Sequence, residues 1–169
     1  MQRGVDLDVR NDRDFVPLGL AIGACNMPAV RFLLDQYRAR GRKEQDVLRE
    51  LIERPPLDKS GDTNPLIHGV IRQNVDPIAR RAMVKLLVQE ARADIWAEKS
   101  QKMVMKRNNT RTYACTFMPV HAAAHVGLQP VIDFFLTECG MPVDTRTSDM
   151  KFTVLQWLTM SGRWSSCPW

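Results

Sequence analysis

The stretch Met118-Pro119-Val120-His121-Ala122-Ala123-Ala124 decides the fold, because the chain contains the same pattern more than once. Two other segments also have proline in second place, an aliphatic residue in third place and a small residue in sixth place: Val16-Pro17-Leu18-Gly19-Leu20-Ala21-Ile22 and Asn64-Pro65-Leu66-Ile67-His68-Gly69-Val70. A fourth segment, Thr153-Val154-Leu155-Gln156-Trp157-Leu158, fits more loosely. Self-similarity of this kind indicates a repeat architecture.

Each repeat is predicted to form two helices. Proline is well tolerated in the first turn of a helix, because the N–H that it lacks has no intrahelical partner there. A second helix is expected to begin near Pro28, Pro77 and Pro130, where apolar residues follow at helical spacing. Asp76 is a candidate N-cap for the second of these helices. All of them are apolar on one side only, so each repeat needs neighbours.

The pattern resembles the ankyrin repeat, a unit of about 33 residues whose T-P-L-H-x-A signature opens the first of two helices. His121 matches the signature histidine, whereas Gly19 and Ile67 replace it in the first two units. The resemblance implies an all-α solenoid of helical hairpins, with about four repeats and short finger loops in a single domain over residues 1–169. The approximate units are 4–36, 58–98, 112–144 and 148–169.

Uneven spacing predicts two insertions, at about 37–57 and 99–111. Pro17 and Pro65 lie 48 residues apart and Pro65 and Pro119 lie 54 apart, well above a period of about 33. The first insertion is expected to hold a supplementary helix over residues 44–53 that stops before Pro55. Its single apolar stripe is Val47, Leu48, Leu51 and Ile52. The second insertion is expected to be a loop outside the repeat core.

The composition indicates an intracellular globular protein. The chain has 169 residues, of which 44% are hydrophobic, enough to bury a sizeable core. No apolar run approaches the roughly 20 residues that a spanning helix needs, so we expect no membrane partner. Its four cysteines lie far apart without a C-x-x-C motif, which favours a reducing compartment over a disulfide scaffold. We predict a cytoplasmic location, with the nucleus left open.

The positive charge is concentrated in the second insertion. The chain carries a formal net charge of +5, and no acidic residue lies between Lys99 and Ile132. The cations of that segment are Lys99, Lys102, Lys106, Arg107 and Arg111. A solvated loop, a contact for an acidic protein and a phosphate-binding element all fit this pattern. We rank nucleic acid below a protein partner, because the sequence holds no nucleic-acid-binding motif.

Metal or thiol chemistry has one candidate group, formed by Cys115, His121, His125 and Cys139. Its spacing matches no zinc finger, and the resemblance gives His121 a structural hydrogen bond near the start of its helix. The sequence contains no glycine-rich phosphate loop, G-x-S-x-G or H-E-x-x-H. We therefore expect no metal, no cofactor and no enzyme activity, and a metal-dependent or thiol enzyme is the least favoured alternative.

The resemblance implies a protein-interaction or scaffold module that holds a partner along its finger loops and first helices. The first-helix candidates are Gly23, Ala24, Ile71, Arg72, His125 and Val126. The finger candidates are Arg13, Phe15, Thr63, Phe117, Lys151 and Phe152. The basic insertion adds Lys102, Lys106, Arg107 and Arg111. The alternative function is a module that binds nucleic acid or an acidic ligand through residues 99–111.

Two alternatives stay open for the C-terminal end of the array. The last unit has a first helix followed only by a short segment, Trp164 to Trp169. Either this segment caps the stack, or the chain is a fragment and the array continues in a longer protein. The apolar face of this end is also a candidate contact for a homodimer.

Overall fold

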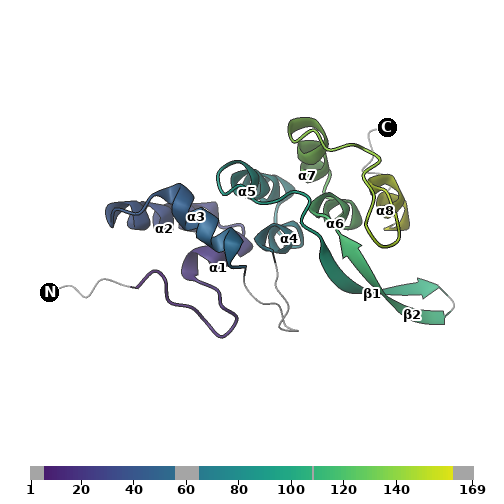
Figure 1. Ribbon diagram of the computed structural model, residues 1–169, viewed down its shortest axis with the longest axis horizontal. Coiled ribbons are helices and arrows are strands. Elements are labelled where there is room, and N and C mark those ends of the chain that lie inside the picture. Colours follow the sequence, from purple (N-terminus) through teal and green to yellow (C-terminus); the bar gives the residue numbers. More distant parts are fainter. Residues whose placement is uncertain (1–5, 56–64, 108, 162–169) are drawn as a thin grey trace. The chain divides into compact units, whose positions relative to one another are not determined.

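The computed structural model describes residues 6–55, 65–107 and 109–161 (Figure 1). The described chain is mostly helical, as the sequence predicts. It forms two compact units, Met1–Ala93 and Asp94–Trp169. We describe each unit by itself.

The first unit contains two successive helical hairpins. Helix α1 (Pro17–Gly23) packs against α2 (Met27–Ala39), and α4 (Leu66–Ile71) packs against α5 (Pro77–Gln89). The two first helices, α1 and α4, also contact each other. Proline occupies the first turn of α1, α2 and α5, where it removes no helical hydrogen bond.

Side-chain caps fix the starts of the two longer helices. The Asp76 carboxylate accepts a hydrogen bond of 2.9 Å from the Ala79 N–H at the start of α5, which confirms the predicted cap. The Asn26 side chain accepts one of 3.1 Å from the Ala29 N–H at the start of α2. Each cap satisfies a backbone donor that has no partner inside the helix.

The supplementary helix is confirmed as α3 (Glu44–Glu53). It packs on α2, and the buried members of its apolar stripe are Val47, Leu48 and Leu51. Glu44 and Asp46 lie in its first turn, where negative charge interacts favourably with the helix dipole.

A hydrogen-bonded cluster around Tyr37 ties the N-terminal segment to α2. The buried Tyr37 hydroxyl donates to the Leu7 carbonyl oxygen at 2.7 Å and lies 3.0 Å from an Asp8 carboxylate oxygen. Arg42 forms ion pairs with Asp8 (3.1 Å) and Glu50 (2.6 Å), and its guanidinium carbon lies 5.1 Å from the centre of the Tyr37 ring. Burial, together with the Asp8 carboxylate, raises the pKa of Tyr37, so its hydroxyl remains a donor.

The second unit contains a third helical hairpin and, after it, the helix of the fourth repeated segment. Helix α6 (Pro119–Val126) packs against α7 (Gln129–Asp133) and α8 (Val154–Met160), and α7 continues as a π-helical turn, η1 (Phe134–Glu138). Gly127 ends α6 at φ 69°, a left-handed conformation that glycine adopts without steric cost. Helix α8 begins with a capping box formed by Thr153 and Gln156.

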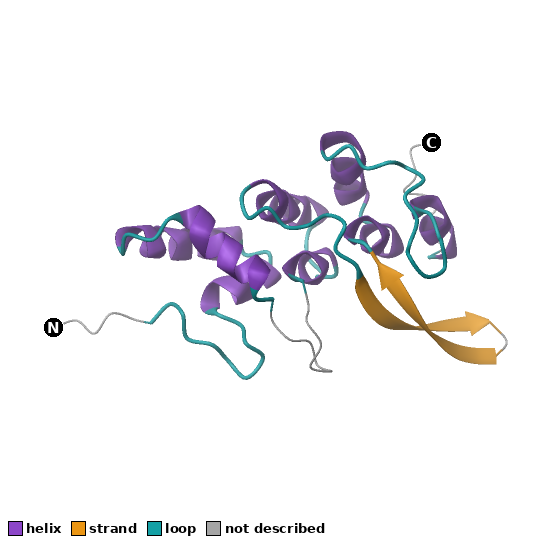
Figure 2. Ribbon diagram, in the orientation of Figure 1, coloured by secondary structure: helices purple, strands orange, loops and turns teal. Residues whose placement is uncertain are grey.

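The basic insertion is a β-ribbon, so the expectation of a loop is wrong. Strands β1 (Lys99–Arg107) and β2 (Asn109–Phe117) pair antiparallel from Lys99 opposite Phe117 to Arg107 opposite Asn109 (Figure 2). The physical reason is that the ladder gives the backbone groups of an excursion of this length partners of their own. Its β-branched and aromatic residues favour the extended conformation.

Candidate functional site

The finger loop before α1 is shaped by one asparagine. The Asn11 side-chain oxygen accepts hydrogen bonds from the N–H groups of Arg13 and Phe15, each at 3.0 Å. Asp14 at φ 62° completes the turn. The result is that Arg13 is exposed and Phe15 is half-buried beside the start of α1.

The first-helix candidates of the first unit lie at the ends of α1 and α4, either as the last residue of the helix or as the residue after it. Gly23 is half-buried and Ala24 is exposed. Arg72 is the C-cap residue of α4, where its backbone N–H donates to carbonyl oxygens of the helix, and its side chain is half-buried. Burial lowers the pKa of the Arg72 guanidinium, but an arginine stays protonated across the physiological range. Thr63 lies outside the described residues.

Two of the predicted contact residues are buried instead. Ile71 is 0% exposed at the end of α4, and Phe117 is 1% exposed at the end of β2. The ring centres of Phe117 and Trp157 lie 4.6 Å apart, so Phe117 belongs to an aromatic cluster in the core of the second unit. Neither side chain is available to a partner, because both lie at apolar positions that the fold covers.

The remaining candidates of the second unit lie on α6 and on the loop before α8. His125 and Val126 are half-buried, Lys151 is exposed and Phe152 is half-buried. The His125 ring packs edge-on to Trp157, with 5.8 Å between ring centres. The exposed positions of this region therefore lie beside aromatic rings that pack against one another.

The loop that carries Lys151 is tied to the base of the ribbon by two carboxylates. Ser148 donates to Glu98 from its backbone N–H (3.1 Å) and its hydroxyl (2.6 Å), and the Thr116 N–H donates to Asp149 at 2.7 Å. Burial by itself raises the pKa of Asp149, but hydrogen bonds from the backbone N–H groups of Met150 and Thr116 outweigh it and lower that pKa. The carboxylate is therefore a fixed structural acceptor.

The proposed metal or thiol residues do not form a ligand cluster. The His121 Nε2 lies 3.0 Å from the Thr145 carbonyl oxygen, and the side chain is fully buried. Burial lowers the pKa of His121, so the neutral ring donates its Nε2–H to that carbonyl. Burial also raises the pKa of the Cys115 thiol, which disfavours the reactive thiolate. Among the described residues, no three His, Cys, Asp or Glu side chains gather as metal ligands.

The structure brings the four basic candidates of the insertion onto one ribbon but divides them between its faces. Residues directly opposite in an antiparallel pair share a face, and neighbours along a strand alternate. Lys102 and Lys106 therefore occupy positions on one face, and Arg107 and Arg111 occupy positions on the other. Charge counting in the sequence could not separate these two pairs.

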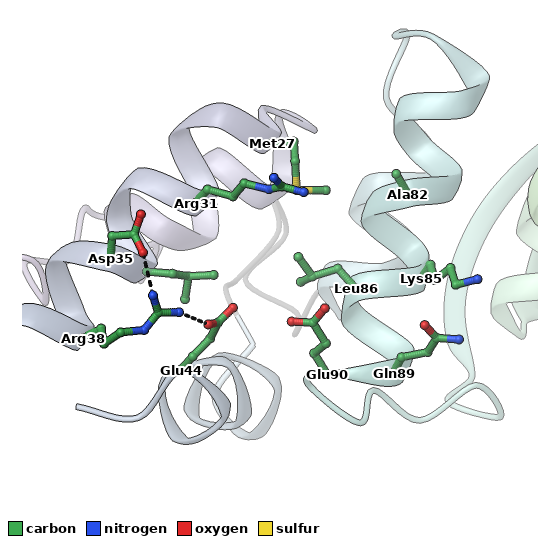
Figure 3. A pocket seen from close by; sticks show the side chains of 11 residues that line it. Met27, Arg31, Asp35, Arg38, Glu44, Ala82, Lys85, Leu86, Gln89 and Glu90 are labelled. Atoms are coloured by element: carbon green, nitrogen blue, oxygen red, sulfur yellow. Dashed lines mark hydrogen bonds and ion pairs between the residues drawn. The ribbon is translucent and has the colours of Figure 1, made fainter. Parts of the chain in front are cut away.

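The sequence analysis missed a groove between α2 and α5, with a volume of about 540 Å³. Leu34 and Leu86 line it beside charged residues, and Arg38 bridges Asp35 (3.0 Å) and Glu44 (2.9 Å) at its edge (Figure 3). The sequence feature that could have indicated this groove is the first insertion, because Glu44 at the start of α3 contributes to the lining. The two ion pairs of Arg38 therefore neutralise the carboxylates of Asp35 and Glu44 at the edge of the groove.

Comparisons with known proteins give no match: no protein-family model matches the chain, and neither does any curated protein. Within the described ranges, none of the helices combines the length and apolar character needed to cross a bilayer.

Proposed function

We propose that the chain is an ankyrin-type protein-interaction module. The observation that carries the proposal is the repeated neighbour order: a short first helix, begun at or beside a proline, pairs with a second helix in α1/α2, α4/α5 and α6/α7. First helices also neighbour first helices, α1 beside α4 in one unit and α6 beside α8 in the other. Stacked repeats contact their neighbours in this way.

In each unit, the proposed partner surface follows the finger loops and the ends of the first helices. In the first unit it uses Arg13 and Ala24, which are exposed, and Arg72, which is half-buried. In the second unit it uses His125 and Lys151. Three of these residues are lysine or arginine, so the proposed partner is an acidic protein.

An intracellular, cytoplasmic setting fits this module. Cys25, Cys115 and Cys139 are all free thiols, and free thiols persist where the compartment is reducing. The proposal involves binding only, without a cofactor.

The test replaces two alanines of the full chain, one on the proposed surface and one away from it, by the same charged residue. Ala24 follows α1 and Ala39 ends α2, and both are exposed, so Ala24→Glu and Ala39→Glu make the same change on the proposed surface and away from it. Peptides are selected against the wild-type chain from a displayed random library, and their affinities are measured for both variants.

We expect Ala24→Glu to weaken the selected peptides by about tenfold or more, because it puts a negative charge on a surface that binds an acidic partner, and Ala39→Glu to weaken them by less than about twofold. Equal effects of the two substitutions, or no effect of Ala24→Glu, would contradict the proposed surface. Circular dichroism and thermal melting of both variants control for folding.

A further inference from the structure

The groove between α2 and α5 lies within the first unit and has an apolar floor. Met27 and Leu34 of α2 and Ala82 and Leu86 of α5 contribute apolar side chains to its lining. Ala82 is exposed, and Met27 and Leu86 are half-buried. The volume of about 540 Å³ lies within the range of pockets that enclose a ligand, about 300–1,000 Å³. The groove therefore offers an apolar surface of useful size to a ligand.

Two large apolar side chains are exposed beside this lining. Ile78 precedes Ala82 by four residues on α5, so both lie on one face of that helix, and Ile78 is 71% exposed. Phe32, next to Arg31 on α2, is 62% exposed. A single exposed apolar residue needs no explanation, but two of them beside an apolar groove indicate an interaction surface.

The walls of the groove have the spacing and length of a helix-binding site. The lining runs from Met27 to Arg38 on α2 and from Ala82 to Glu90 on α5, with a residue at every third or fourth position. At a rise of 1.5 Å per residue, these walls are about 16 Å and about 12 Å long. A groove between two helices accepts the apolar stripe of a third helix, whose side chains recur at the same spacing. The groove therefore fits a helix of about three turns.

Two charged side chains of the groove are available to such a ligand. Within the described part of the chain, neither the Arg31 guanidinium nor the Glu90 carboxylate has an ion pair or a side-chain hydrogen bond. Both residues are exposed. By contrast, Arg38 already binds two carboxylates of the lining, at 3.0 and 2.9 Å.

These two available charges have opposite sign and lie toward opposite ends of the groove. In Figure 3, Arg31 lies toward the Met27 end and Glu90 lies opposite Glu44. Arg38, which binds Glu44, follows Arg31 by seven residues, which is about two helical turns or 10 Å. A helix that complements both charges carries an acidic and a basic side chain about two turns apart, with apolar side chains between them.

We propose that the groove binds an amphipathic helix of a partner protein, with apolar residues on Leu34 and Leu86, an acidic residue at Arg31 and a basic residue at Glu90. This inference goes beyond the proposed function, because it places a second binding surface on the first unit and gives its partner a different charge pattern. A wholly acidic helix is disfavoured, since it would bring negative charge to the Glu90 carboxylate.

The first test changes the sign of each available charge in the full chain. The probe is a displayed library of helical peptides of about 15 residues with Glu or Lys at two positions seven residues apart and varied apolar residues between them. It contains peptides with one acid and one base in either order, with two acids, and with two bases. Peptides are selected separately against the wild type, Glu90→Lys and Arg31→Glu.

We expect the wild type to select peptides with one acid and one base, in whichever order the binding direction requires. Glu90→Lys makes both available charges positive and should select two acids, whereas Arg31→Glu makes both negative and should select two bases. Each variant should bind the peptides of the wild type about threefold or more weakly. A change of preference of this kind cannot result from misfolding.

The second test blocks the apolar floor with a matched pair of substitutions. Ala82 lines the groove, Ala39 at the end of α2 does not, and both are exposed. We expect Ala82→Trp to weaken the peptides of the wild type by about tenfold or more, because the indole occupies the groove, and Ala39→Trp by less than about twofold. Melting curves of both variants control for folding.

Selection of the same charge pattern by all three chains would overturn the proposal in favour of general charge attraction. A library that yields no peptide weakened by Ala82→Trp would overturn it as well. A dimer in light scattering that Ala82→Trp dissociates would assign the groove to a second copy of the chain instead. Peptides that respond to Ala24→Glu but to no groove variant would refute this inference and leave the proposed function standing, whereas peptides that respond to the groove variants but not to Ala24→Glu would support it independently of the first-helix surface.

Discussion

Substituting His121 by alanine should destabilise the second unit strongly. The imidazole is fully buried, and its Nε2 lies 3.0 Å from the Thr145 carbonyl oxygen. Losing this hydrogen bond inside the protein costs about 1–2 kcal/mol, and the cavity left by the ring adds about 1–3 kcal/mol. We expect the free energy of unfolding in urea to fall by about 2–5 kcal/mol at a pH near 7.5. His125→Ala, four residues along the same helix, is the control and should cost about 1 kcal/mol, because that side chain is half-buried and its ring centre lies 6.0 Å from that of Phe117 and 5.8 Å from that of Trp157.

The effect should also depend on pH, with a sign that follows from the burial of His121. Burial lowers the pKa of the folded-state imidazole, so below the ordinary pKa of about 6.5 the unfolded chain binds the proton more readily than the folded chain. The contribution of His121 is therefore complete above about pH 7 and is lost as the pH falls through 6.5 toward the folded-state pKa. The difference between wild type and His121→Ala should shrink accordingly. A loss below about 1 kcal/mol, or one that is unchanged between about pH 7.5 and pH 5, would refute this reasoning.

Two further substitutions test the helix caps and the loop before α8. Asp76→Ala removes the acceptor of the Ala79 N–H and should lower the free energy of unfolding by about 1 kcal/mol in urea, whereas Asp76→Asn should retain most of it; equal losses would contradict the capping role. Asp149→Asn should destabilise the chain near neutral pH, and because hydrogen bonds lower the pKa of the folded Asp149 carboxyl, the difference from wild type should vanish as the pH falls through the ordinary pKa of about 3.9 and below. Melting temperatures measured across that range check it, and a difference that persists at low pH would contradict the assignment.

The helix positions could be predicted from the sequence because their signals are local. Proline in a first turn and an acceptor such as Asp76 fix where a helix begins, whatever packs on it later. The same is true of α3, where the amphipathic stripe and the following Pro55 set both ends. The π-helical turn η1 was not predicted, because its residues follow the same apolar spacing as an ordinary helix.

The ribbon depends on strand pairing, and the burial of two candidate residues depends on tertiary packing. Neither can be read from the sequence around those residues. The prediction of a loop was based on the charges of residues 99–111. The strands are stabilised by pairing with residues beyond that range, as far as Phe117. Ile71 and Phe117 are each the last residue of an element. At such positions an apolar residue can face solvent or the core, and only the neighbours in the fold decide which.

The cluster around Tyr37 makes the segment near Leu7 part of the cooperative folding unit of α2. Detaching that segment would leave the buried Tyr37 hydroxyl without its carbonyl acceptor and would break the Asp8 ion pair of Arg42, at a cost of about 1–3 kcal/mol for the hydroxyl alone. In hydrogen exchange, the amides of the last turns of α2 should therefore lose protection together with those of the N-terminal segment, as one sub-global opening. A fragment intended to preserve the first hairpin has to begin before Leu7.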